Sequence, residues 1–155
     1  MEAVIASAVA VLGTLLGAGL THAFQQRTVA RTEEFARRER LRQERLEVFG
    51  RYASALLNYR RALVHRWFCE HEDPPPADPG EARTRSYDLR SEAQEALFRV
   101  RMLSDGALGA RATGVLDAIE ELPRTEERAE LDRRRRETKE LISAFVTEAT
   151  TRLGG

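Results

Sequence analysis

AVIASAVAVLGTLLGAGLTHAF, residues 3–24, is the stretch that decides the fold, because it contains no Asp, Glu, Lys or Arg in a chain that is 32% charged. A helix rises about 1.5 Å per residue and the hydrocarbon core of a bilayer is about 30 Å thick, so roughly 20 apolar residues span it. The stretch meets that length. We therefore predict that residues 1–24 form a transmembrane anchor.

Two other interpretations of this stretch stay open. A buried helix of a soluble domain usually carries a polar stripe, which residues 3–24 lack. A cleaved secretory signal normally begins with a basic segment, whereas only Met1 and Glu2 precede the apolar run here.

Arginine residues gather on the C-terminal side of the predicted anchor. They are Arg27, Arg31, Arg37, Arg38, Arg40, Arg42 and Arg45. Because basic residues flanking a membrane helix stay on the cytoplasmic side, we predict a single-pass protein of the plasma membrane with its N-terminus outside and its C-terminal domain in the cytoplasm. We expect the first four of these residues, Arg27, Arg31, Arg37 and Arg38, to contact the headgroups of membrane lipid.

Small residues recur along one face of the predicted anchor. Gly13 and Gly17 form a GxxxG pair, and Ala6 and Ala10 extend the same face. Small residues let two membrane helices approach closely, so this face predicts association of the anchors and a homo-oligomer. The alternative is an anchor that is simply rich in Ala and Gly.

The chain after the anchor reads as one long helix that changes character at Leu46. Residues 25–45 contain no Pro or Gly and few apolar residues, which predicts a charged helical stalk. From Leu46 onwards apolar residues recur at helical spacing, so they predict bundle packing, coiled-coil packing or a partner interface. The candidates are Leu46, Phe49, Tyr52, Leu56, Leu63 and Trp67.

The segment HEDPPPADPGE, residues 71–81, must interrupt the helix, because proline removes a backbone donor and clashes with the preceding turn. Further helices are predicted over residues 82–103, 107–122 and 126–152, with Asp105 and Thr125 as N-caps. No alternating strand pattern appears. We therefore predict an all-α fold in which residues 46–155 form an antiparallel helical bundle of four helices, or of three if residues 104–106 only kink a longer helix.

Few residues suggest chemistry. His65, Cys69 and His71 resemble part of a zinc site, but no second ligand pair stands at the usual spacing, so we expect no metal. The arginines at residues 133–136 spread around a helix and are interpreted as a solvated face. The net charge is zero, so we expect no direct nucleic-acid binding, and without a catalytic or cofactor motif we expect neither an enzyme nor a cofactor.

The N-terminal half resembles a known family. The similar segments are Val11-Leu12-Gly13-Thr14-Leu15-Leu16-Gly17, Gln25-Gln26-Arg27 with the stalk after it, Arg45-Leu46-Glu47 and Tyr59-Arg60-Arg61-Ala62. Over residues 4–67 they resemble the kilB-type spread proteins of actinomycete conjugative plasmids and their chromosomal relatives. The resemblance implies a membrane-associated accessory factor that helps plasmid DNA to spread between cell compartments, with no catalytic residues.

Together these observations predict a non-enzymatic, membrane-anchored helical adaptor that self-associates and recruits a protein partner at the cytoplasmic face. Two alternatives belong to other classes. One is a membrane-perturbing lysis or toxin-like accessory factor, and the other is a soluble helical interaction module.

Overall fold

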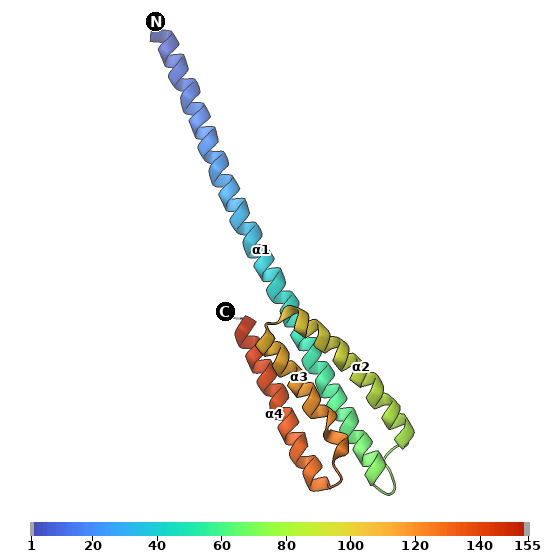
Figure 1. Ribbon diagram of the computed structural model, residues 1–155. Coiled ribbons are helices and arrows are strands. Elements are labelled where there is room, and N and C mark those ends of the chain that lie inside the picture. Colours follow the sequence, from blue (N-terminus) through green and yellow to red (C-terminus); the bar gives the residue numbers. More distant parts are fainter. Residues whose placement is uncertain (1, 154–155) are drawn as a thin grey trace. The chain divides into compact units, whose positions relative to one another are not determined.

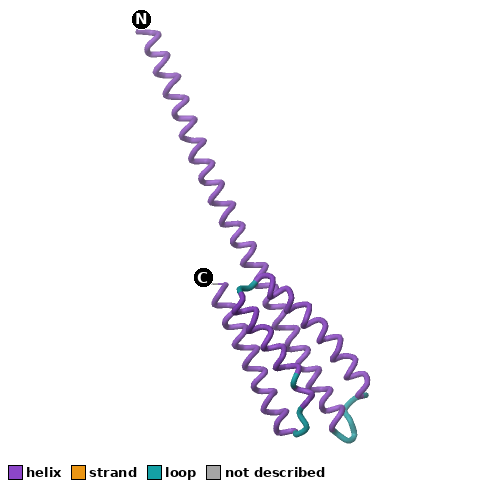
Figure 2. Tube along the Cα trace, viewed as in Figure 1, coloured by secondary structure: helices purple, strands orange, loops and turns teal. Residues whose placement is uncertain are grey.

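A computed structural model describes the backbone of residues 2–153 and the side chains of residues 32–153. Its elements are α1 (Glu2–His71), α2 (Pro79–Leu103), α3 (Gly106–Glu120), the short 3-10 helix η1 (Leu122–Arg124) and α4 (Arg128–Leu153). The described backbone is helical throughout, apart from loops and turns, and contains no strand (Figure 2). The predicted all-α fold is therefore confirmed, with four α-helices in the described chain.

The chain divides into two compact units, Met1–Leu41 and Arg42–Gly155. The first unit holds the N-terminal part of α1, and the second holds the bundle. The predicted borders at residues 24 and 45 stay predictions. Within residues 32–153 no helix combines the length and the apolar character that a membrane crossing requires. The predicted anchor lies outside the residues whose side chains are described.

Within the second unit, consecutive helices run in alternating directions (Figure 1). The first turn back follows the predicted proline-rich loop, and α2 then begins at Pro79, three residues earlier than predicted. Proline is tolerated there because the first turn of a helix leaves its N–H groups without intrahelical partners. The carboxylate of Asp78 accepts a hydrogen bond from the Glu81 amide at 2.8 Å and so caps this helix.

The break between α2 and α3 is a true turn rather than a kink. Ser104 has an extended backbone and ends α2, and Asp105 caps α3 by accepting a hydrogen bond from the Leu108 amide at 2.9 Å. The predicted cap at Asp105 is thus confirmed. In a continuous helix the Leu108 amide would bond to a backbone carbonyl of the preceding turn. Here the Asp105 carboxylate accepts that hydrogen bond instead, so a new helix begins and the bundle has four helices, not three.

The predicted N-cap at Thr125 is wrong. Its hydroxyl donates to the Leu122 carbonyl oxygen at 2.9 Å within η1, and α4 begins only at Arg128. The Thr125 carbonyl also accepts a hydrogen bond from the Trp67 indole at 2.7 Å. Contacts within the turn and to α1 therefore hold this residue in place, which local sequence cannot reveal.

The core of the bundle draws on all four helices. Burying a large apolar side chain stabilises a fold by about 1.5–3 kcal/mol, so this cluster is the main source of stability. Its fully buried large side chains include Tyr52, Leu56, Leu63, Val100, Val115, Ile119, Leu131 and Phe145. The rings of Tyr52 and Phe145 meet edge to face, with their centroids 5.3 Å apart.

Hydrogen bonds from Arg60 connect α1 to α4. The Arg60 guanidinium donates to the Thr138 hydroxyl at 3.0 Å and to the Arg135 carbonyl oxygen at 2.6 Å, both in α4. Burial, and to a smaller extent the guanidinium of Arg135, lowers the pKa of Arg60. Partial burial of the charged Arg60 guanidinium is unfavourable. The two hydrogen bonds that it donates to α4 offset this cost.

Candidate interaction surfaces

The structure places only part of the predicted membrane-facing set. The side chains of Ala6, Ala10, Gly13 and Gly17, and those of Arg27 and Arg31, lie outside the described residues. Arg37 and Arg38 are exposed on α1, and Arg38 forms an ion pair with Glu34 one turn earlier. Contacts of these arginines with lipid headgroups stay a prediction.

The predicted apolar stripe of α1 separates into two parts. Phe49, Tyr52, Leu56, Leu63 and Trp67 are buried in the core of the bundle. Leu46 is 48% exposed and borders a surface groove. Only Leu46 of this set is therefore open to a partner. Its period matched that of the core residues, so the sequence alone did not distinguish it.

The potential zinc ligands do not converge. The Cys69 sulfur is buried and lies 3.6 Å from Nε2 of His65. His71 instead stacks on Trp67, with ring centroids 4.3 Å apart, and its Nδ1 lies 2.9 Å from the Trp67 carbonyl oxygen. Among the described residues no group of three or more His, Cys, Asp or Glu side chains is placed to hold a metal ion.

The arginine run at residues 133–136 is largely neutralised within α4. Arg133 and Arg134 both pair with Glu130, and Arg135 pairs with Asp132. Hydrogen bonds from Arg134 and Arg133 lower the pKa of Glu130. These pairs lie at the surface, exposed or partly buried, and contribute little stability, but they place a carboxylate beside Arg133, Arg134 and Arg135.

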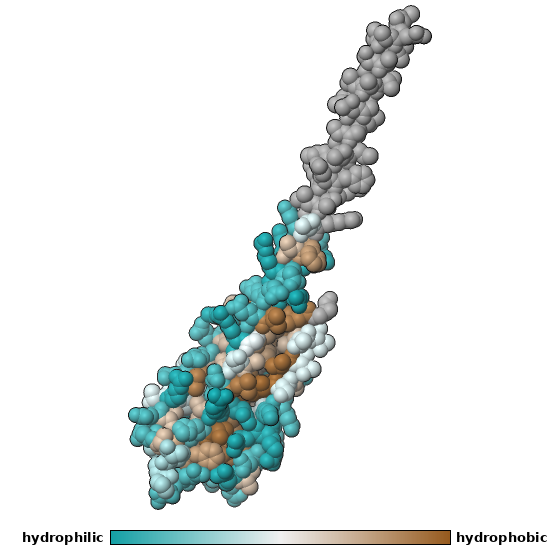
Figure 3. Space-filling view, turned by 180° about the vertical axis from the view of Figure 1, so that it is seen from behind, coloured by the Kyte–Doolittle hydropathy of each residue, from teal (hydrophilic) through white to brown (hydrophobic). Residues whose placement is uncertain are grey.

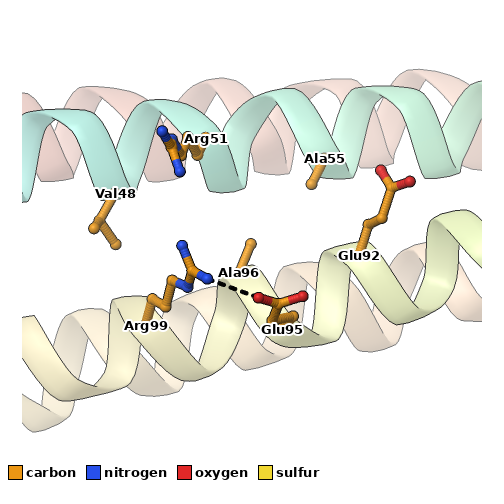
Figure 4. A pocket seen from close by; sticks show the side chains of 7 residues that line it. All are labelled: Val48, Arg51, Ala55, Glu92, Glu95, Ala96 and Arg99. Atoms are coloured by element: carbon orange, nitrogen blue, oxygen red, sulfur yellow. Dashed lines mark hydrogen bonds and ion pairs between the residues drawn. The ribbon is translucent and has the colours of Figure 1, made fainter.

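A shallow groove between α1 and α2 is lined by balanced charges (Figure 4). Arg51 from α1 and Arg99, Glu92 and Glu95 from α2 line a volume of about 270 Å³, and Arg99 forms an ion pair with Glu95 of the same helix at 2.7 Å. The groove thus has no net charge that would select an anionic or a cationic ligand.

A second groove between α1 and α2 carries basic groups and lies closer to the C-terminal end of α1. Arg61, His65 and Arg85 line about 400 Å³ together with Asn58, Ala62 and Leu89, and no carboxylate contributes to the lining. All three side chains are exposed, so water and salt screen the charges of Arg61 and Arg85.

The groove between α1 and α4 is different in kind. We call it the apolar groove. It has a volume of about 110 Å³ and is lined by Leu46, Phe49, Gly50, Ala53, Phe145, Val146, Ala149, Thr150 and Leu153, without a charged residue. Apolar surface gathers along one flank of the bundle among hydrophilic side chains (Figure 3). Val146 of α4 is 42% exposed at this groove.

Comparison with known protein families matches residues 46–153 to the KilB plasmid transfer protein. The match begins at Leu46 in α1 and extends through α2 and α3 to the end of α4. It therefore covers the later helices, which the resemblance over residues 4–67 did not include. No curated protein and no solved structure matches the chain.

The match covers well over half of the 155 residues and coincides with the helical bundle. The chain therefore belongs to the KilB plasmid transfer protein family.

Proposed function

We propose that this protein is a non-enzymatic adaptor in plasmid transfer, anchored in the plasma membrane by residues 1–24, with its helical bundle in the cytoplasm. The observation that carries the proposal is the family match over residues 46–153. Because that match spans the bundle, the bundle is the part to which we assign the role in transfer.

The helical character of the N-terminal unit supports the anchored arrangement. Residues 3–24 lack charged side chains and lie within the helical range Glu2–His71, as a membrane anchor requires. Within it, residues 32–41 expose most of their side chains, including Phe35. A helix of this kind suits a spacer between a membrane and a binding module better than a packed element.

The outer face of α2 is our candidate for recruiting a partner protein. Phe98 and Met102, four residues apart and so on one face of the helix, are 61% and 75% exposed. Tyr87 lies three helical turns before Phe98 on the same face and is also exposed. Exposed aromatic and methionine side chains are enriched at protein interfaces, and here three of them share one face of α2.

A plasmid-spread assay in the host tests the adaptor role. The full chain with Phe98→Ser and Met102→Ser should reduce transfer strongly while its cellular level and membrane fraction stay unchanged. Glu92→Ser on the same helix is the matched control and should transfer normally. Normal transfer by the double variant would remove α2 as the recruiting face.

Deleting residues 1–24 tests the anchor within the same assay. The proposal predicts that transfer is lost and that the remaining chain leaves the membrane fraction. If overproduction of the full chain instead kills the host, and deletion of residues 1–24 abolishes that toxicity, a membrane-perturbing role replaces the adaptor role.

A further inference from the structure

The apolar groove is a surface that the described part of the chain leaves uncovered. Leu46 and Val146, one from each wall, are 48% and 42% exposed. Leu57, eleven residues after Leu46 and so on the same face of α1, is 43% exposed. Among residues 32–153 nothing covers these side chains, so they are available to a second molecule.

Gly50 lies in the middle of this groove. A Cβ atom added there would meet no atom within 4 Å, so no described neighbour requires a glycine at this position. Glycine in a helix interior is unfavourable, and the missing side chain lets another helix approach closely. Gly114 of α3 is equally open but lines none of the described grooves, so it is the apolar setting that distinguishes Gly50.

The lining of the apolar groove also fits a partner with the same surface. Across a two-fold axis each residue lies near its own copy, so any charge close to the axis meets a like charge. The apolar groove contains no Asp, Glu, Lys or Arg. The two grooves between α1 and α2 both have charged linings, with Arg51 and Glu92 in one and Arg61 and Arg85 in the other.

We propose that the apolar groove pairs with the apolar groove of a second copy of this chain, with Gly50 close to the two-fold axis. The direction of pairing rests on the proposed function, because two chains anchored in one membrane present α1 in the same direction. Tethering also raises the local concentration of the second copy. The axis then runs along α1, and each Gly50 lies near its own copy.

Cysteine cross-linking of the full chain tests this pairing. Gly50→Cys should give a disulfide-linked dimer under mild oxidation in cells. Gly114→Cys is the matched control, since it places the same side chain at an open position of α3, and it should remain monomeric. The native Cys69 is only 3% exposed and should not react in either variant. Equal cross-linking of both variants, or none at position 50, would overturn the proposal.

Val146→Arg provides a second measurement, because the side chain is exposed and its replacement leaves the core intact. Added to Gly50→Cys, it should lower the cross-linked fraction at least tenfold. Lys139→Glu, an exposed change on α4 that does not line the groove, is the control. Unchanged cross-linking with Val146→Arg would contradict a paired groove.

The direction of pairing has its own readout. Leu46→Cys and Leu57→Cys are about 16 Å apart along α1, from a rise of about 1.5 Å per residue. Parallel pairing predicts that each variant cross-links with itself. Preferential cross-linking between the two variants when they are co-expressed would mean antiparallel pairing and would refute the proposed direction.

The outcome is separable from that of the proposed function, because the dimer is measured in whichever cell fraction contains the chain. A Gly50→Cys dimer in the soluble fraction would support the paired groove and refute the anchor. A membrane-bound chain that never cross-links at position 50 would support the anchor and refute the paired groove.

Discussion

The phenolic hydroxyl of Tyr52 in α1 donates a hydrogen bond to the backbone oxygen of Ala112 in α3 at 2.8 Å. Its ring packs edge to face against Phe145 of α4. One fully buried side chain therefore joins three helices of the bundle. Burial, with a smaller contribution from the carboxylate of Asp117, raises the pKa of Tyr52 far above its ordinary value, so the hydroxyl stays a donor at every physiological pH.

Tyr52→Phe should lower the free energy of unfolding by about 1 kcal/mol, because it removes the hydrogen bond but keeps the ring. Tyr52→Ala should cost about 3–5 kcal/mol, because it also leaves a cavity beside Phe145. Denaturant unfolding of the full chain in non-ionic detergent, followed by circular dichroism, measures both. Tyr87→Phe, at an exposed position, is the control. Equal stability of Tyr52→Phe and the unsubstituted chain would show that the bond contributes nothing.

Arg60 and Arg61 are neighbours with opposite roles, so they form a matched pair. Arg60 is half-buried and donates hydrogen bonds to α4, whereas Arg61 is exposed and lines the second groove between α1 and α2. Arg60→Gln should destabilise the bundle by about 1–2 kcal/mol, because two acceptors lose a charged donor. Arg61→Gln should change stability by less than about 0.5 kcal/mol. Thermal unfolding of the two variants compares them, and the reverse order would contradict the described contacts.

Two glycines of α3 should respond differently to the same substitution. A Cβ at Gly114 meets nothing, so Gly114→Ala should raise the free energy of unfolding by up to about 1 kcal/mol through helix propensity. A Cβ at Gly109 would lie 3.3 Å from the Ser104 hydroxyl oxygen, so that gain should be reduced or reversed. Parallel melting curves measure the difference. A larger gain at Gly109 would mean that Ser104 moves aside freely.

Glu70 makes part of the stability depend on pH. Burial is the largest single influence and raises the pKa of Glu70, but hydrogen bonds and charges from Arg83 and Arg66 together outweigh it and hold the pKa below its ordinary value of 4.5. A depressed pKa in the folded state stabilises the fold above pH 4.5, and this contribution is lost as the pH falls through the lower folded-state value.

Glu70→Gln should therefore lower stability at neutral pH and flatten the loss of stability below pH 4.5. Unfolding measured between about pH 3 and pH 7 tests this, since these values bracket the titration of a carboxylate. Glu130→Gln is the comparison: its arginine pairs lie at the surface of α4, so its effect should largely disappear near 1 M salt, where screening acts over about 3 Å. If the stability of Glu70→Gln falls below pH 4.5 as steeply as that of the unsubstituted chain, the role of Glu70 is refuted.

The architecture of the bundle follows from signals that act locally. Prolines at residues 74–76 cannot continue a helix, and Asp105 can cap one without help from the rest of the chain. Apolar period placed most of the core of α1 correctly. The division of the chain into four α-helices was therefore predictable, apart from the first residues of α2 and α4, the end of α3 at Glu120 instead of residue 122, and the 3-10 helix η1 (Leu122–Arg124).

The interaction surfaces were less predictable, because they depend on how the helices pack. Leu46 and Phe49 follow the same sequence period, but only Phe49 is enclosed by the other helices. Similarly, the sequence around Thr125 does not indicate that the Trp67 indole donates a hydrogen bond to the Thr125 carbonyl oxygen. The pairing of α1 with α4, which creates the apolar groove, is a relationship between distant segments that periodicity does not encode.

Membrane topology of the full chain tests the central claim most directly. C-terminal fusions to a cytoplasm-active fluorescent protein and to a periplasm-active phosphatase report where the bundle lies. The account predicts membrane-bound fluorescence and no phosphatase activity. Phosphatase activity would place the bundle outside the cytoplasm, and fluorescence that stays in the supernatant after high-speed centrifugation would refute the anchor. Either result would contradict a cytoplasmic adaptor held at the membrane.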